Sequence, residues 1–438
     1  MANSPIKIDF SKALREKFFE KYENEITEIN NKISSRNING SQHLDFFDVK
    51  DKITKSDFEF IKKAYSLLVK KNIEYLVVVC PQQIRLQSEA LIDLNKGKYS
   101  DKDKIKILYV DETIDGRDLV LLSQFLADKR FVLNVISQSG KSMEINLVYR
   151  EIKQILIKKF GPQVASDYIF VTTNNNYGDL FKEAKENNYH LLGISDGVKE
   201  KYVNFTPAVL FPLACANINI IEYINGATAA NEYYAKTPLE KNEAYLYALI
   251  RFILVKNNFK LEHLNVYSAS YVKLAKLMKM YFIEANTAKE RGLLVEISKQ
   301  PSDLMTYSQL AISLPIRTFD THILFTNPTY DLQVSMNNEG EDDYLNHLSK
   351  FTYNFIGKVI AESVIDSHVG LHKIASLKID IEDYSAYNLG WIIAFIHRTA
   401  IMCAYLHEID PFYQQGDISY STALEQNIKS IIGGNKHE

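Results

Sequence analysis

The sequence predicts an α/β protein with two lobes, each built on a parallel sheet, and with helices at both ends of the chain. Short apolar runs rich in β-branched residues alternate with helical stretches, and strands separated by helices form parallel sheets. This alternation occurs twice, before about residue 205 and again after about residue 281, with a mainly helical stretch between. With 438 residues, of which 46% are apolar, the chain has room for two or three domain cores.

The N-terminal segment, residues 1–70, is predicted to be helical, because Phe10, Leu14, Phe18 and Phe19 fall on one face of a helix. The first lobe, residues 71–205, then contains five strand-like runs separated by helical patterns. These runs are residues 74–80, 106–110, 131–136, 168–172 and 190–194. Their order and spacing predict the first parallel sheet.

The second lobe is predicted within residues 206–410, after a mostly helical connection over residues 207–281. Its strands are expected around residues 322–325 and 374–379, and a long apolar helix over residues 387–407 closes the lobe. The last part of the chain, residues 411–438, is predicted to form a C-terminal arm.

Composition limits the possible partners and cofactors. A formal net charge of −3 and the lack of a basic stripe give no reason to expect nucleic acid or an anionic membrane surface. Cys80, Cys215 and Cys403 lie far apart, without metal-ligand spacing or a disulfide framework. No secretory signal opens the chain, and no apolar run reaches the roughly 18 residues of a membrane span. We therefore expect a cytoplasmic protein without a metal or other cofactor.

The turn that follows the run at 131–136 is the strongest functional signal. Ser137, Ser139 and Ser142 supply hydroxyl groups and Lys141 a positive charge, just before an amphipathic helix. The N–H groups of a first helical turn bind anions, so this turn is suited to a phosphate group. A nucleotide P-loop is excluded, because Val135 stands where that motif needs a glycine. A simpler alternative is that the serines only cap the helix.

Five segments, in order, resemble the glucose-6-phosphate isomerase family between about residues 70 and 421. Residues 137–144 are similar to its Ser-x-Ser-Gly-Thr-Thr-x-Glu phosphate loop, and residues 196–214 to an arginine followed by a Thr-Pro-x-Gly-Leu-Leu-Pro helix. Residues 283–292 resemble its Gly-Glu-Ser stretch, residues 303–309 its Asp-Leu-His-Ser-Met-Gly-Gln motif, and residues 387–416 its last long helix and the following loop. The resemblance implies two sugar-isomerase (SIS) domains, each a three-layer αβα lobe. It also implies conversion of glucose 6-phosphate to fructose 6-phosphate in glycolysis and gluconeogenesis.

The departures from the family fall on the residues that carry its chemistry. The resemblance assigns the base that moves a proton between C1 and C2 to Glu284. It places Met305 and Ser421 where the family has a ring-opening histidine and lysine, and Lys201 where an arginine stabilises the enediolate. A thioether cannot transfer a proton at neutral pH, and a serine hydroxyl is a poor acid. The sequence therefore predicts an isomerase homologue with impaired or lost catalysis.

The sugar-binding segments are altered as well. By resemblance, Ser137, Ser139, Lys141 and Ser142 bind the substrate phosphate, and Lys141 adds a charge in place of a threonine. Residues 79–83 replace a glycine-rich turn of the family, and a proline there removes a backbone donor. We therefore expect the protein to retain phosphate binding even where its proton-transfer groups are lost.

Two other functions stay open beside a weakened isomerase. The chain is also consistent with a non-catalytic hexose-phosphate sensor, or with a structural subunit that binds an unidentified protein partner. A working isomerase would need other groups in place of the missing ones, and His322, His368, His372 and Lys429 are the candidates. The family builds each site from two subunits, so the resemblance also implies a homodimer.

Overall fold

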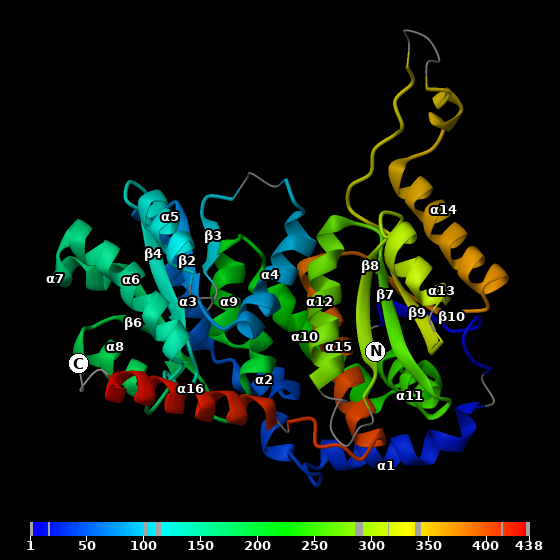
Figure 1. Cartoon of the computed structure of the whole chain (residues 1–438), viewed down its shortest axis with the longest axis horizontal. Helices are drawn as coiled ribbons and strands as arrows, with labels where there is room; N and C mark the ends of the chain where they lie inside the picture. The colour runs from blue at the N-terminus through cyan, green and yellow to red at the C-terminus, as the bar shows by residue number, and fades with distance from the viewer. Residues whose placement is uncertain are drawn as a thin grey trace.

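Two five-stranded sheets lie side by side, with a layer of helices between them (Figure 1). The computed structural model describes residues 3–15, 18–99, 103–110, 115–284, 292–313, 315–337, 343–412 and 415–434. A continuous apolar core joins the second sheet, the helices between the sheets and one face of the first sheet. The α/β class with two lobes is therefore confirmed.

The first sheet is fully parallel and has the order β3-β2-β4-β5-β6. Its strands are β2 Tyr75–Val79, β3 Lys106–Val110, β4 Phe131–Ile136, β5 Ile169–Asn174 and β6 His190–Ile194. All five lie where the apolar runs predicted them. Strands β4 and β5 are buried on both faces, as is typical of central strands in a parallel sheet.

Helices cover both faces of the first sheet. One face packs on α5 Gly116–Leu126, α6 Met143–Phe160 and α8 Asp179–Glu186, and the other on α3 Lys55–Lys70, α4 Gln82–Lys96 and α9 Pro207–Cys215. The chain runs from β2 outward to β3 and then crosses β2 to form β4. The direction of winding thus reverses between β2 and β4, which is where open α/β sheets bind ligands, beyond the carboxyl ends of the strands.

The second sheet has the order β1-β10-β9-β7-β8 and repeats the winding of the first, with its reversal between β7 and β9. Its parallel strands are β7 Phe259–Val266, β8 Leu294–Lys299, β9 Arg317–Phe325 and β10 Ala375–Ile381. Its fifth strand, β1 Ile6–Asp9, pairs with β10 in the antiparallel sense. Helix α14 Tyr353–Asp366 covers the outer face of this sheet (Figure 1).

Two predictions about these elements were wrong. The helical prediction for residues 1–70 fails at β1, because Ile6 and Ile8 alternate with charged residues and pair with a sheet edge. The helical prediction for residues 207–281 fails at β7, whose polar residues find partners inside the protein and so break the apolar pattern of a buried strand. Strand β8 was not predicted.

The remaining helices are distributed along the chain. They are α1 Glu23–Ser34, α2 Val49–Lys52, α7 Pro162–Ala165, α10 Ile220–Lys236, α11 Glu243–Lys256, α12 Val272–Glu284, α13 Gln309–Ser313, α15 Ala386–Leu406 and α16 Gln415–Gly434. The predicted long helix and the C-terminal arm correspond to α15 and α16. The predicted domain boundaries at residues 70, 205 and 410 stay a prediction.

Helices α10 and α15 cross in direct backbone contact. A Cβ atom added to Gly226 would lie 1.9 Å from the carbonyl oxygen of Tyr387, and one added to Gly390 would lie 2.1 Å from that of Tyr223. By length and composition α15 is the one described helix that qualifies as a candidate membrane span, but 94% of its apolar window is buried inside the protein. Its apolar sequence is therefore accounted for by its place in the core.

Candidate functional site

The serine-rich turn, residues 137–142, lies at the carboxyl edge of the first sheet, where the winding reverses. Strand β4 ends at Ile136 beside β2, and α6 begins at Met143. The N-terminal N–H groups of this 18-residue helix therefore face the position where ligands bind in sheets of this type. The predicted strand, turn and helix are confirmed.

The serine hydroxyls hold the turn in shape. The N–H of Gly140 donates to Ser137 Oγ over 3.1 Å, and the N–H of Lys141 donates to Ser139 Oγ over 3.2 Å. Ser142 is the N-cap of α6, since its Oγ accepts a hydrogen bond from the N–H of Ile145. The capping alternative is thus correct for Ser142, whereas the other two serines brace the turn. Each Ser hydroxyl also has one proton to donate.

Exposure divides the turn into a buried base and an open rim. Ser137 is buried, Ser142 is half-buried, and Ser139 and Lys141 are exposed. Gly140 has a φ of 67°, and a Cβ at this position would lie 3.0 Å from Leu180 Cβ on α8. Glycine is required here by both the backbone angle and the close packing of α8. Lys141 and Ser139 can reach an anion in solvent without any change in the core.

A second segment, residues 196–201, lies over the turn. Gln138 Nε2 donates to the carbonyl of Val198 over 2.6 Å, and the Gln138 N–H donates to Glu200 Oε1 over 3.3 Å. The buried Gln87 of α4 donates to the carbonyl of Glu200 over 2.9 Å. By resemblance Lys199 and Glu200 stand in place of two glycines of the family, but the contact between Glu200 and Gln138 was not predicted, because only the folded chain brings them together.

Helix α16 reaches the first turn of α6 from the far end of the chain (Figure 1). The hydroxyl of Tyr420 donates to Glu144 Oε1 over 2.5 Å, and Ser142 Oγ donates to Glu144 Oε2 over 3.1 Å. Burial acts to raise the pKa of Glu144, but these hydrogen bonds outweigh it and lower the pKa. Ser421, the next residue after Tyr420, is exposed. The helix that carries Ser421 thus contacts the first turn of α6, which follows the serine-rich turn.

Lys201 and Glu284 lie on elements that contact each other. Lys201 belongs to the short helical segment Glu200–Phe205, and its carbonyl accepts a 2.5 Å hydrogen bond from Tyr281 of α12. Glu284 is the last residue of α12, one helical turn beyond Tyr281. The side chain of Glu284 lies outside the described part of the structure. The two elements are therefore adjacent, while the roles of Lys201 and Glu284 stay predictions.

Met305 lies in a single π-helical turn, Leu304–Ser308, and its side chain is 88% exposed. A thioether in this setting provides neither a proton donor nor a base. The structure therefore offers no chemistry at this position that would replace a ring-opening histidine.

The proposed substitutes have other roles or exposed positions. His322 and His368 are buried around Asp320, where His368 Nδ1 lies 2.6 Å from Asp320 Oδ2. Burial lowers the pKa of His322 to about 4, so this ring is neutral at pH 7. His372 is exposed, and Lys429 pairs with Glu425 on the exposed face of α16 over 3.5 Å. The contacts described for these side chains do not link them to the serine-rich turn.

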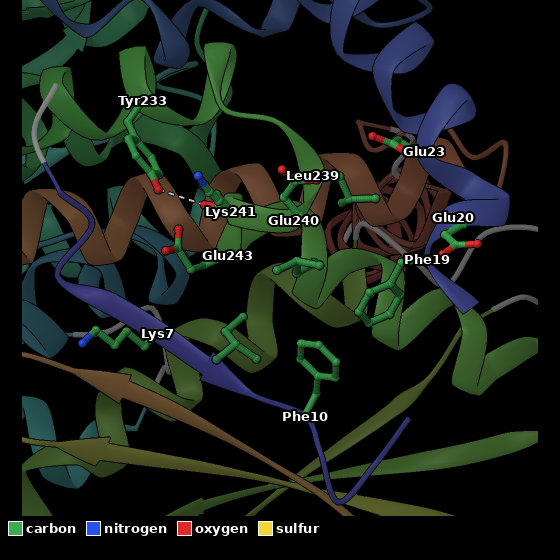
Figure 2. A pocket seen from close by; sticks show the side chains of 12 residues that line it. Lys7, Phe10, Phe19, Glu20, Glu23, Tyr233, Leu239, Glu240, Lys241 and Glu243 are labelled. Atoms are coloured by element: carbon green, nitrogen blue, oxygen red, sulfur yellow. Dashed lines mark hydrogen bonds between the residues drawn. The ribbon is translucent and has the colours of Figure 1, made fainter. Parts of the chain in front are cut away.

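A cavity of about 720 Å³ lies elsewhere, between β1, the start of α1 and the N-terminus of α11 (Figure 2). Its floor is apolar and includes Phe10 and Phe19, and its rim carries glutamate and lysine side chains. Burial raises the pKa of Glu243, on this rim, to about 7. Among the described residues, no group of three or more His, Cys, Asp or Glu side chains is arranged to hold a metal ion.

Known sequences decide the family. The chain is 30% identical over 420 residues to glucose-6-phosphate isomerase of Mycoplasmopsis pulmonis, a match that covers 96% of this chain and 98% of the relative. The chain belongs to the glucose-6-phosphate isomerase family. The enzyme of the same name from Fusobacterium nucleatum is 29% identical over 423 residues, with 94% and 92% of the two chains covered. No protein-family model matches the chain.

Solved structures agree on the fold. A hypothetical protein from Thermus thermophilus matches with a TM-score of 0.86 at 18% identity, over 97% of this chain and 99% of the other. A glucose-6-phosphate isomerase from Chlamydia trachomatis matches with a TM-score of 0.77 at 12% identity, over 99% and 90% of the two chains. The fold of this family member is thus the two-domain sugar-isomerase fold, as the resemblance implied.

Proposed function

We propose that this member of the glucose-6-phosphate isomerase family binds a hexose 6-phosphate at residues 137–142 and isomerises it slowly or not at all. The proposed setting is the cytoplasm, and the proposed assembly is a homodimer, as the family resemblance implies. One observation carries the proposal. The serine-rich turn, residues 137–142, keeps the groups that suit an anion, whereas Met305 and Ser421 replace the residues that transfer protons in the family.

The proposal of phosphate binding rests on the position of the serine-rich turn in the fold. The turn lies at the reversal of the first sheet, before the N-terminus of α6, and the exposed Lys141 adds a positive charge. Helix N-termini and lysines at such positions favour phosphate groups. The hydroxyl protons of Ser137 and Ser139 supply further donors at the same place.

The proposal of weak or absent turnover rests on the loss of the ring-opening histidine and lysine of the family. Met305 and Ser421 stand at the two positions that open the sugar ring in the family. Positioned acids and bases are typically worth about 10²–10⁴-fold each in rate. Glu284 remains as the proposed base, and Lys201 keeps the charge of the arginine position without its planar fork. We therefore expect binding with little turnover.

Turnover is tested with purified protein and fructose 6-phosphate in a coupled assay, with Glu284→Gln as the control. The expected rate is below about 0.1 s⁻¹, which is two orders of magnitude under the typical enzyme median of ~10 s⁻¹. A rate of about 10 s⁻¹ that disappears in Glu284→Gln would overturn the catalytic half of the proposal.

Binding is tested by calorimetric titration with glucose 6-phosphate, using Lys141→Ala against Lys158→Ala, an exposed lysine in the last turn of the same helix. We expect Lys141→Ala to weaken binding about 2- to 5-fold, because an exposed charge pair contributes up to about 1 kcal/mol. Lys158→Ala should bind like the parent. Equal affinities in all three proteins would contradict the assignment of the site.

A working isomerase is the second candidate, favoured by the name of the relatives that match nearly the full chain at 29–30% identity. In that case groups other than those at Met305 and Ser421 open the ring. The assay separates the candidates, since only a working isomerase loses about 10²-fold or more in rate on Glu284→Gln. Absence of both turnover and binding would leave the structural-subunit alternative.

A further inference from the structure

Glu200 places a negative charge on a backbone amide of the serine-rich turn. Its Oε1 accepts the hydrogen bond from the Gln138 N–H over 3.3 Å. Gln138 follows Ser137 directly, so this amide belongs to the same turn whose donors are proposed to hold a phosphate. The family has a glycine at the Glu200 position by resemblance, and glycine has no side chain that reaches the turn.

The segment that carries Glu200 is fixed from several sides. The side-chain amide of Gln138 holds the carbonyl of Val198, and the buried Gln87 holds the carbonyl of Glu200 itself. A Cβ added to Gly197 would lie 2.2 Å from Asp45 Oδ2, so the backbone passes close to a neighbouring loop. These contacts fix the backbone that carries Glu200. The fold therefore holds the Glu200 carboxylate close to the serine-rich turn.

We infer that Glu200 is an internal competitor for the anion site, which lowers the affinity of residues 137–142 for phosphate and must leave the Gln138 amide before a phosphate binds. This inference rests on the proposed function, because it concerns the same site.

The electrostatic argument is direct. A sugar phosphate carries between one and two negative charges at neutral pH, and a carboxylate on the same donors repels it. The N–H that Glu200 occupies is also closed to the ligand until the carboxylate moves. Lys141, Lys199 and Lys201 lie in the same two segments and offset part of this repulsion. Glu200 therefore lowers the affinity of the turn for a phosphate group without abolishing it.

The test is Glu200→Gln, which keeps the shape and an acceptor oxygen but removes the charge. Glucose 6-phosphate and inorganic phosphate serve as probes in calorimetric titrations of the full chain, at low and high salt. We expect both probes to bind Glu200→Gln about 10-fold more tightly than the parent at low salt. The gain should shrink at about 0.5 M salt, because screening weakens charge repulsion near the surface.

Glu151→Gln provides the matched control, since Glu151 is exposed on α6 and its replacement changes the net charge equally. It should leave both affinities unchanged. Glu200→Ala is the second variant and should also bind more tightly, with circular dichroism and thermal unfolding to verify that both variants fold.

The outcomes separate this inference from the proposal beneath it. If the parent binds glucose 6-phosphate and neither Glu200 variant binds more tightly, Glu200 is no competitor and the proposed function stands. If neither the parent nor the variants bind either probe, the proposed function fails and the inference falls with it. If Glu151→Gln gains as much affinity as Glu200→Gln, the effect comes from the net charge of the protein. That result would overturn the proposed role of Glu200.

Discussion

Glu243 shows how a single side chain on the cavity rim couples stability to pH. It lies at the N-terminus of α11, beside Lys241 and Tyr233 on the rim (Figure 2). One carboxyl oxygen, Oε2, is buried without a hydrogen-bond partner, and burial raises the pKa to about 7. The folded protein thus binds a proton at this carboxyl over a range where the unfolded chain has released it.

The direction of the pH effect follows from this difference. A carboxyl with a raised folded-state pKa contributes stability that is complete below about pH 4.3 and is lost as the pH rises through about 7. We expect Glu243→Gln to raise the free energy of unfolding at pH 8 by about 1–2 kcal/mol relative to its effect at pH 5. Urea unfolding at both pH values measures this change. Glu240→Gln, on the exposed part of the same rim, is the control and should show little difference, and an equal effect of Glu243→Gln at both pH values would contradict the prediction.

Some residues of the candidate site could be predicted from the sequence alone, and others could not. The serine-rich turn was predictable because its strand, hydroxyl groups and helix start are contiguous in the chain. Glu200 was not, because its carboxylate meets Gln138 only through the packing of a segment about 60 residues away. Tyr420 was missed for the same reason, since it reaches Glu144 from the last helix. Local patterns predict the turn itself, and tertiary contacts determine what lies over it.

At the scale of elements, the crossing of α10 and α15 is the tightest contact between helices described above. Gly226 and Gly390 each face the backbone of the other helix, and neither has room for a Cβ atom. The helices approach closely because both surfaces lack side chains at the crossing point. Larger residues would force them apart and open the core around Trp391, which is fully buried.

This crossing gives a stability prediction. Gly226→Ala should lower the free energy of unfolding by about 2–3 kcal/mol, because overpacking at a backbone contact costs more than the gain in helix propensity. Gly357→Ala is the control, since Gly357 lies in α14 and its Cβ would meet nothing within 4 Å. That variant should be unchanged or more stable by up to about 1 kcal/mol. Chemical denaturation of both variants measures the difference, and a neutral Gly226→Ala would mean that the helices separate easily.

The errors in element prediction also have physical causes. Strand β1 is four residues long, and its alternation was outweighed by the helical spacing of Phe10, Leu14 and Phe18. Strand β7 carries Glu262 and His263 in its interior, where Glu262 pairs with Arg251 over 2.8 Å and His263 lies near Asp320. Buried polar residues with partners in distant elements remove the apolar signature on which strand prediction depends.

At the scale of the whole molecule, buried histidines make folding sensitive to acid. Burial lowers the pKa of His322 to about 4, and burial together with Arg398 lowers the pKa of His397 to about 3. An unfolded histidine has a pKa of about 6.5. Between pH 6.5 and about 4 the unfolded chain therefore binds protons that the folded protein excludes, and stability falls as the pH falls.

We expect the free energy of unfolding to decrease from pH 7 to pH 5, because the two buried histidines together lose more stability over this range than Glu243 gains, as measured by urea unfolding at several pH values. His397→Gln should reduce this slope, because it removes one excluded proton, while His347→Gln at an exposed position should not. Burial acts to raise the pKa of Asp320, but the 2.6 Å hydrogen bond from His368 and the nearby His263 outweigh it and lower the pKa, so the stability that Asp320 contributes is lost only below about pH 4. A stability that is constant between pH 7 and pH 5 would contradict this account.

The pairing of β1 with β10 also affects the order in which the chain folds during synthesis. Ile6 is synthesised well before its partner Ile381, which follows about 375 residues later. At typical rates of about 5–20 residues per second, the first strand waits roughly 20–75 s for its place in the second sheet. The first sheet, whose strands lie within residues 75–194, is complete long before then. Strand β1 thus waits without its partner while the residues between β1 and β10 are synthesised, and its pairing with β10 then ties the N-terminal segment to the second sheet.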